Sequence, residues 1–438
     1  MDAGLKIRSL RRLAFKSDSL PVSRKPQSPT PGGESSHQPL RPSLGAVAAL
    51  FLLPFLYLNL FTPLRYLPQT KGDFSNYHRA AVSLSEGGSP YVVGQFDYPA
   101  LVAYLVLPLA GLEMLQARQF WLAVNWVALI WAAVLMFRLC GRDLAALVGT
   151  GLVLCFAGTT QENLVLGQIH PLMLALIAGA LVDLDRHPGR SALWIGIATG
   201  LKLWPILLLL PHIRARRLRA TLIGVAVALI LIVVPALSLR PPKIPTTSSY
   251  WMGTPAPLSF SLPSVALRFA DWPDAGAELP FDWRAGNNPD SLELAPQKRL
   301  LSVAVSAAVL AFGVGLLFFR QIEGLRLALA LLALAPLASP IGWYHYQIFA
   351  FPALALLGSA LIRRRAYRWL PVWVLGGTLM TRFQSLGFGA YVESYGWTAE
   401  NPFLLGLTTS MVAVLGALLF SLLALVPEGC LGLKSYSV

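Results

Sequence analysis

Charged residues are scarce in this sequence. Only 13% of its 438 residues are Asp, Glu, Lys or Arg, whereas 55% are hydrophobic. Soluble globular domains contain about 25% charged residues, so the composition argues against a soluble protein. Cysteine is rare too. Cys140, Cys155 and Cys430 lie near apolar segments without the spacing of a metal site, and they provide no obvious disulfide framework.

Motifs of several enzyme classes are also absent. The sequence contains no phosphate-binding Walker loop, no His–Glu zinc motif and no nucleophile elbow. We therefore expect no bound metal and no cofactor. The net charge of +14 does not indicate a nucleic-acid partner, because the basic residues cluster in short connections between apolar segments.

Apolar runs long enough to cross a bilayer are abundant. The clearest runs are residues 44–62, 119–137, 219–238, 300–319, 347–362 and 402–426. A transmembrane helix needs roughly 20 apolar residues, and several of these runs reach that length. The sequence therefore predicts an all-α polytopic integral membrane protein, a helical bundle of about 11–12 transmembrane segments surrounded by membrane lipids.

Basic residues mark one side of the predicted bundle. They gather in five short connections, residues 138–143, 183–190, 214–219, 320–326 and 363–368. These connections hold 14 basic and 4 acidic residues, whereas the two large loops 63–97 and 239–299 hold 9 of each. Because Lys and Arg favour the cytoplasmic side, we expect the five connections and both termini to be cytoplasmic and the two large loops to be external.

The ends of the chain differ from its middle. Residues 1–43 are rich in Ser, Pro and Arg and predict a disordered basic cytoplasmic tail. Within it, "LKIRSLRRLAFK" has a basic amphipathic pattern that fits either contact with the inner leaflet or an organelle transit peptide. Residues 44–427 are expected to form a single transmembrane catalytic domain, and residues 428–438 a cytoplasmic tail.

Two segments do not read as ordinary crossings. Residues 98–112 are short and interrupted by prolines, and a full crossing there would place the basic connection 138–143 outside. We therefore expect an interfacial or re-entrant helix in the first external loop region. Gly200, Lys202 and Pro205 interrupt residues 191–212, which predicts a broken pair of short helices.

Polar clusters gather on the predicted external side. They are "KGDFSNYHRA" (71–80), "TTQENLVLGQIHP" (159–171), "PLSFSLPSVALRF" (257–269) and "SPIGWYHYQ" (339–347). The only carboxylate of the first cluster is Asp73, which fits a functional acid. It equally fits a helix cap or a partner of Arg79. His345 fits a site residue or a member of the interfacial aromatic group of Trp343, Tyr344 and Tyr346.

The other polar residues also have two interpretations each. Lys202 and Arg268 fit either a lipid phosphate site or side chains that extend to the headgroup level. Gln168 and His170 fit either a binding role or the hydrogen bonding of backbone groups at a helix start. Glu162 fits a solvated loop acid.

Taken in order, several stretches resemble glycosyltransferase family 87. These are "GDFSNYHRAA", "SPYVVGQFDYPA", "GQIHPLMLAL", "GIATGLKLWPILLL" and "SPIGWYHYQ". The resemblance runs from about residue 44 to residue 365. It departs from the family's usual pattern at Tyr98-Pro99-Ala100, at Gln168-Ile169-His170 and at Ser259-Phe260-Ser261. It implies a GT-C fold and an inverting hexosyltransferase, an α-mannosyltransferase, in a bacterial plasma membrane with its active site external.

The resemblance also implies substrates and roles. The donor is a polyprenyl-monophosphate sugar and the acceptor a glycolipid or glycan. Asp73 corresponds to the family's base, and His345 to its late histidine near the donor phosphate. From their chemistry, Lys202 and Arg268 are candidates for binding the phosphate. The remaining candidate substrate-binding residues are Tyr77, His78, Gln168, His170, Trp343 and Tyr346.

Two other functions fit the same apolar segments. One is a transporter or flippase of lipid-linked sugars, and the other is a non-catalytic scaffold for envelope assembly. Neither requires a base at residue 73. No internal repeat stands out in the sequence, which argues against an inverted-repeat transporter.

Overall fold

The computed structural model describes residues 44–67, 72–92, 96, 98–156, 158–239, 261–270, 296–340, 344–382 and 402–426. The predicted tails 1–43 and 428–438, and most of the predicted loop 239–299, lie outside these residues. The chain divides into the units Met1–Arg41 and Pro42–Val438, and all the described residues belong to the second unit. Every regular element among them is a helix and none is a strand, which confirms the predicted all-α class.

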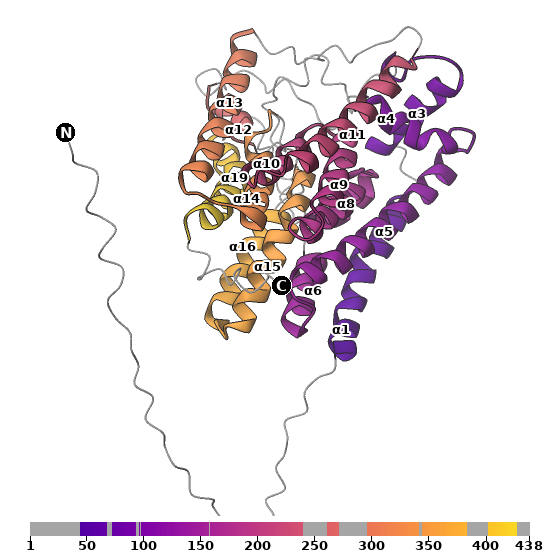
Figure 1. Cartoon of the computed structure of the whole chain (residues 1–438). Coiled ribbons are helices and arrows are strands. Elements are labelled where there is room, and N and C mark those ends of the chain that lie inside the picture. The colour runs from indigo at the N-terminus through magenta and orange to yellow at the C-terminus, as the bar shows by residue number, and fades with distance from the viewer. Residues whose placement is uncertain are drawn as a thin grey trace, which may run out of the picture. The chain divides into compact units, whose positions relative to one another are not determined.

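The first half of the chain forms many short helices and a few long ones (Figure 1). In order they are α1 (Leu44–Leu56), η1 (Tyr57–Phe61), α2 (Thr62–Tyr66), α3 (Asp73–Ser85), η2 (Pro90–Val92), α4 (Ala100–Val106), η3 (Leu107–Leu109), α5 (Met114–Leu139), α6 (Leu144–Phe156), α7 (Gly158–Leu166), α8 (His170–Asp183), α9 (Pro188–Leu201), η4 (Trp204–Leu209), α10 (Leu210–Arg214) and α11 (Leu218–Leu237). The segment η1 is a π-helix and the other η segments are 3₁₀ helices.

The second half continues the pattern. It contains α12 (Leu262–Ala270), α13 (Pro296–Phe319), α14 (Gly324–Ala338), η8 (Tyr344–Ala350), α15 (Phe351–Arg363), η9 (Tyr367–Trp369), α16 (Leu370–Arg382) and α19 (Pro402–Leu425). The predicted break within 191–212 is confirmed, because α9 ends at Leu201 and the backbone of Lys202 is extended. The apolar part of 98–112 forms only α4 and η3. At a rise of about 1.5 Å per residue, this ten-residue helical segment is too short to cross a bilayer core of about 30 Å.

Several helices are long and apolar enough to cross a membrane. Four such helices occur in the described residues, namely Met114–Leu139, Leu218–Leu237, Leu300–Phe319 and His345–Arg363. A fifth arises if α6 and α7, which are bent by 53° at their junction, count as one span. On α11 and α13 most of the apolar surface is exposed, with Phe312 at 73%. Such surface is a liability in water and is expected in lipid. The protein is an integral membrane protein, and its total of 11–12 segments stays a prediction.

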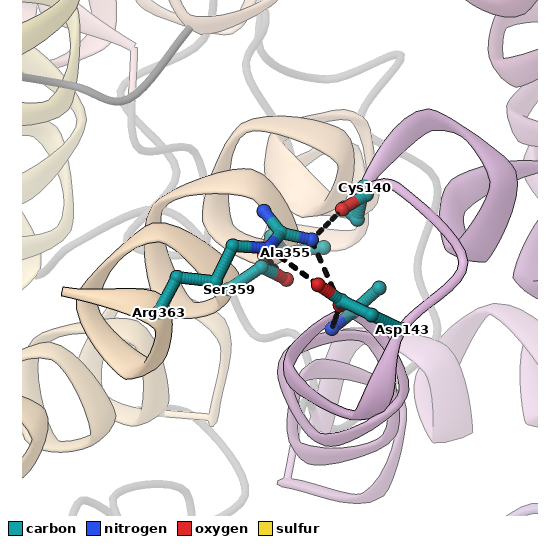
Figure 2. A network of polar contacts seen from close by, with 6 residues as sticks. Cys140, Asp143, Ala355, Ser359 and Arg363 are labelled. Carbon is teal, nitrogen blue, oxygen red and sulfur yellow. Dashed lines mark hydrogen bonds and ion pairs between the residues drawn. The ribbon is translucent and has the colours of Figure 1, made fainter. Parts of the chain in front are cut away.

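Arg363, the last residue of α15, joins two of the predicted cytoplasmic connections (Figure 2). Its Nε and Nη2 donate to Asp143 Oδ2 and Oδ1 at 2.7 and 2.9 Å, and Nη2 also donates to the Cys140 carbonyl. Asp143 in turn accepts from the backbone N–H of Ala146 at 2.8 Å and caps α6. A bidentate Arg–carboxylate pair fixes both partners in orientation, so the two connections lie together.

Small residues let α6 and α15 approach each other closely near this ion pair. Ser359 Oγ donates to the Ala355 carbonyl at 2.7 Å, and both residues lie on α15 (Figure 2). A Cβ added to Gly149 of α6 would lie 2.5 Å from Ser359 Oγ. Small residues at such contacts are a common feature of helix packing in membranes. Figure 1 accordingly shows α6 and α15 side by side.

The other three basic connections are linked to one another. Arg217 donates to the Leu184 carbonyl at 2.6 Å and to Asp185 Oδ1 at 3.1 Å. Arg214 forms an ion pair with Glu323 at 3.5 Å. The five predicted cytoplasmic connections thus fall into two linked groups.

Candidate active site

The predicted base, Asp73, is the first residue of α3. Gly72 precedes it with a φ of 145°, a conformation that favours glycine. The positive end of the helix dipole favours a carboxylate in this first turn. Asp73 Oδ2 accepts a hydrogen bond from Gln168 Nε2. Arg79 instead donates to Asn76 Oδ1 at 2.6 Å. Asp73 is therefore neither the N-cap of α3 nor the partner of Arg79, and it faces the segment that precedes α8.

Two glycines bring α3 and this segment into contact. Gly167 has a φ of 68°, and a Cβ added to it would lie 2.6 Å from Cβ of Phe74. A Cβ added to Gly72 would lie 3.0 Å from the Leu166 carbonyl oxygen. Trp121 Nε1 donates to the Gly167 carbonyl at 2.8 Å and fixes the turn. The hydrogen bond from Gln168 to Asp73 depends on this close approach.

We expect Gly167→Ala to separate the two segments. The alanine must adopt the left-handed backbone conformation of Gly167, and its methyl group must displace Phe74. The free energy of unfolding should therefore fall by roughly 1–3 kcal/mol, and any activity of the site should fall with it. Thermal unfolding in detergent and an activity assay measure the two effects. Gly87→Ala is the matched control, because Gly87 has a φ of 79° but no atom within 4 Å of an added Cβ. Equal activity losses in both variants would contradict the close-packing argument.

Gln168 holds Asp73 in a fixed orientation. Its Oε1 accepts hydrogen bonds from the hydroxyls of Tyr77 and Tyr98 at 3.1 and 3.2 Å. An amide oxygen only accepts and an amide nitrogen only donates, so the two tyrosines direct Nε2 toward the carboxylate. Gln168 is buried. Rotation of its amide would leave buried polar groups unpaired, which makes rotation unfavourable.

Lys202 lies on the other side of the cluster, at the break after α9. Its Nζ donates to the Tyr346 hydroxyl at 2.6 Å and contacts Nε2 of His170 at 3.2 Å. It also lies 4.0 Å from the centroid of the Tyr346 ring and 5.3 Å from that of Tyr98. These contacts to aromatic faces and polar atoms hold an ammonium group, and no carboxylate within the described residues forms an ion pair with it.

Histidines and an asparagine form a buried layer behind Lys202. His170 Nδ1 lies 2.9 Å from Oδ1 of Asn163, whose Nδ2 donates to the His345 carbonyl at 3.0 Å. Because Oδ1 can only accept, His170 carries its proton on Nδ1 and offers Nε2 to the Lys202 ammonium. The rings of His170 and His345 stack with centroids 5.0 Å apart. The layer therefore fixes the position of His170 Nε2, and with it the orientation of the Lys202 ammonium group.

Charge and burial give Asp73 unusual properties. Burial raises the pKa of Asp73 from the usual 3.8 to about 6, and the positive charge of Lys202 lowers this pKa in part. Burial and the negative charge of Asp73 raise the pKa of the Tyr77 hydroxyl well above its ordinary value, so Tyr77 remains a neutral donor. Asp73 and Lys202 are both partly exposed, whereas Gln168 and His170 are buried. The arrangement can take up a proton at one point and bind an anion at another.

The structure brings together most of the residues that the sequence singles out. The residues joined in the cluster are Asp73, Tyr77, Gln168, His170, Lys202, His345 and Tyr346. The exception is His78, whose Nε2 lies 3.2 Å from the Leu109 carbonyl, against η3. The side chains of Arg268 and Trp343 lie outside the described residues.

Three further residues belong to the cluster or adjoin it. Tyr98 and Asn163 stand within the quoted stretches but carry no charge, so the sequence gives them no priority. Their hydrogen bonds to Gln168 and His170 make them part of the site. Glu162 fits a solvated loop acid in the sequence, but it is half-buried in α7 and its charge interacts with that of Asp73. Among the described residues, no group of three or more His, Cys, Asp or Glu is placed to hold a metal ion.

Fold and site together define a class: a helical integral membrane protein with a carboxylate and an ammonium group over a buried polar layer. The sequence profile of glycosyltransferase family 87 matches residues 96–340, more than half of the chain. The chain belongs to glycosyltransferase family 87, and it is a membrane glycosyltransferase. Within the matched residues lie Tyr98, Asn163, Gln168, His170 and Lys202. Asp73 and His345 fall just before and just after the match. None of the curated proteins compared with the chain matches it.

Proposed function

We propose that this protein transfers a hexose, mannose in the first instance, from a polyprenyl-monophosphate donor to a glycolipid or glycan acceptor. The transfer inverts the anomeric centre, and Asp73 is the base. The observation that carries the proposal is the pairing of a partly exposed carboxylate with a partly exposed ammonium group, each held by its own buried polar partner. The predicted GT-C fold agrees with the long apolar helices and the absence of strands in the described part of the chain.

The reaction needs only one base on the acceptor side. The acceptor hydroxyl gives its proton to Asp73 while its oxygen forms a bond to the anomeric carbon of the sugar. The bond from that carbon to the phosphate oxygen breaks, and the phosphate leaves with the electron pair. Positioned acid–base catalysis of this kind contributes roughly 10²–10⁴-fold. Because Gln168 fixes the carboxylate, little reorientation is needed when the acceptor arrives.

Lys202 is the group best placed to stabilise the leaving phosphate. Its charge is directed by Tyr346 and His170, and a preorganised cation near developing negative charge stabilises the transition state. We assign His345 to the same phosphate side, because it stacks on His170. Arg268 remains a second candidate cation on this side. A monophosphate-linked sugar already carries a good leaving group, so the proposal includes no metal and no cofactor.

The position of the basic connections, at the ends of helices that start at or near the cluster, supports an external active site. Two helices begin at the cluster, α8 at His170 and α15 shortly after His345. A third, α5, begins at Met114, two turns before Trp121, which donates to the Gly167 carbonyl. All three end at basic connections, which favour the cytoplasm. Together with the donor class, this orientation is the basis for placing the enzyme in a bacterial plasma membrane with cytoplasmic termini.

The pKa of Asp73 predicts the acid side of the pH profile. A base must be deprotonated to act, and its pKa in the protein is about 6. We therefore expect kcat/KM to rise about tenfold per pH unit up to pH 6. Burial lowers the pKa of Lys202 to about 7, so the ammonium group that the proposal requires is lost above pH 7, and kcat/KM should fall again there. A carboxylate with an ordinary pKa would keep full activity down to about pH 5. Full activity maintained down to pH 4.5 would contradict the assignment of Asp73, with its raised pKa, as the base.

A donor panel tests the proposed substrate class. Purified protein in lipid nanodiscs is given the same labelled sugar on polyprenyl monophosphate, on polyprenyl diphosphate or on a nucleotide, together with a membrane extract as acceptor. We expect a product from the monophosphate donor only. Transfer from the nucleotide sugar would refute the donor class. A translocated but unmodified donor would instead indicate a flippase.

A further inference from the structure

Three of the turns that follow helices in the basic connections have the same backbone geometry. After α10, α13 and α15 the chain forms a Schellman motif, with a left-handed residue directly after the helix cap. The left-handed residues are Arg216, Gln321 and Arg365, with φ between 52° and 56°. In each motif the next N–H bonds a carbonyl five residues earlier, at 2.8, 3.0 and 2.9 Å. Glycine is the usual residue at this position, because it has no Cβ to crowd the backbone.

Arginine at these positions is therefore unfavourable for the backbone and calls for an explanation. Arg142, after α5, is also left-handed with φ of 59°. Together with Gln321, the three arginines are the only non-glycine residues with positive φ in the described part of the chain. Arg142, Arg216 and Arg365 are exposed. Among the residues that the structure describes, none of these three guanidinium groups has a hydrogen-bond or ion-pair partner.

Each left-handed residue lies two positions from an exposed apolar side chain. The neighbours are Leu144, Leu218, Phe319 and Tyr367, and their exposed fractions are 38%, 68%, 82% and 56%. Exposed apolar residues at the ends of membrane helices belong at the boundary between hydrocarbon and headgroups. The guanidinium groups two residues away are then at the level of lipid phosphates. Arg and Lys at this level are attracted to anionic lipids.

We propose that Arg142, Arg216 and Arg365 form binding points for the headgroups of anionic phospholipids. All three arginines are exposed, and they follow the ends of α5, α10 and α15. The arginines are positively charged and are placed at the level of lipid phosphates, which favours an anionic lipid over an acidic protein as their partner. The lipid contact offsets the backbone strain that arginine causes at these positions. The proposal is independent of which sugar the enzyme transfers.

Glycine substitution separates backbone strain from lipid binding. The full-length protein is placed in nanodiscs of phosphatidylcholine, with or without phosphatidylglycerol, and its thermal unfolding midpoint is measured. For the unchanged protein we expect a midpoint several degrees higher with phosphatidylglycerol. The double variant Arg216→Gly/Arg365→Gly should match or exceed the unchanged protein in phosphatidylcholine, because glycine relieves the strain. Its increase with phosphatidylglycerol should fall to less than half.

Gln321→Gly is the matched control, since it relieves the same backbone strain without removing a charge. It should keep the full increase with phosphatidylglycerol. Arg216→Gln/Arg365→Gln removes the charges and retains the strain, as Gln321 does naturally, and should also lose most of the increase. A full increase in either double variant would overturn the proposal. So would an equal increase caused by inorganic phosphate or by soluble polyglutamate in phosphatidylcholine nanodiscs, which would indicate a free anion or an acidic polypeptide.

Discussion

Asp73→Asn is expected to reduce transfer by roughly 10²–10⁴-fold while the protein remains folded. Asparagine has nearly the same shape as aspartate and can still accept from Gln168 Nε2, but it cannot take the acceptor's proton. Because burial raises the pKa of Asp73 from 3.8 to about 6, ionising this carboxyl lowers the free energy of unfolding as the pH rises between these values, and the full cost remains at neutral pH. Removing that charge should leave stability at neutral pH unchanged or higher. Because the substitution removes only the base, the reduction in transfer is expected in kcat, with donor binding retained.

Glu86→Gln provides the control for this substitution. Glu86 is an exposed carboxylate at the opposite end of the same helix, so the same chemical change there should leave transfer unchanged. Steady-state kinetics and thermal unfolding of both variants in nanodiscs give the comparison. Transfer by Asp73→Asn within threefold of the unchanged rate would exclude Asp73 as the base, whatever its stability.

Lys202→Met is expected to reduce kcat/KM for the donor by roughly 10²–10³-fold. Methionine retains much of the length and apolar character of the lysine stem but removes the charge that Tyr346 and His170 direct. The proposed role concerns the donor phosphate, so both donor affinity and kcat should fall. Lys202→Arg should recover part of the activity, because the charge remains while the geometry at Tyr346 changes.

The second control lies far from the cluster. Arg186 is an exposed cation in a basic connection, and Arg186→Met should change neither donor affinity nor kcat. Donor affinity is measured by competition with a non-transferable polyprenyl-phosphate sugar, and kcat by single-turnover transfer. A Lys202→Met protein that binds donor normally and loses only acceptor affinity would refute the assignment of Lys202 to the phosphate.

Much of the fold follows from the sequence because long apolar runs specify membrane helices. The runs 219–238 and 300–319 correspond to α11 and to most of α13. The helix break at Lys202 was also predictable, because glycine, a charge and proline occur together there. The number of crossings is harder to predict, because the length of a short buried helix such as α8 does not show whether it spans the bilayer.

The site was predictable as a set of residues but not as a geometry. Asp73, Gln168, Lys202 and His345 stand out because polar residues are rare beside apolar segments. Which of them touch depends on two close backbone approaches at glycines, and a single sequence does not reveal such approaches. His78 has the same residue type as a site histidine, yet one helical position beyond Tyr77 is enough to direct it to η3.

The anomeric configuration of the product tests the central claim most directly. A polyprenyl-monophosphate sugar of known configuration, labelled with ¹³C at the anomeric carbon, is incubated with the purified protein and acceptor, and the product is examined by NMR. A single displacement assisted by Asp73 predicts a new glycosidic bond of the opposite configuration. A product of the same configuration as the donor could not arise from a single in-line displacement, and it would contradict the account.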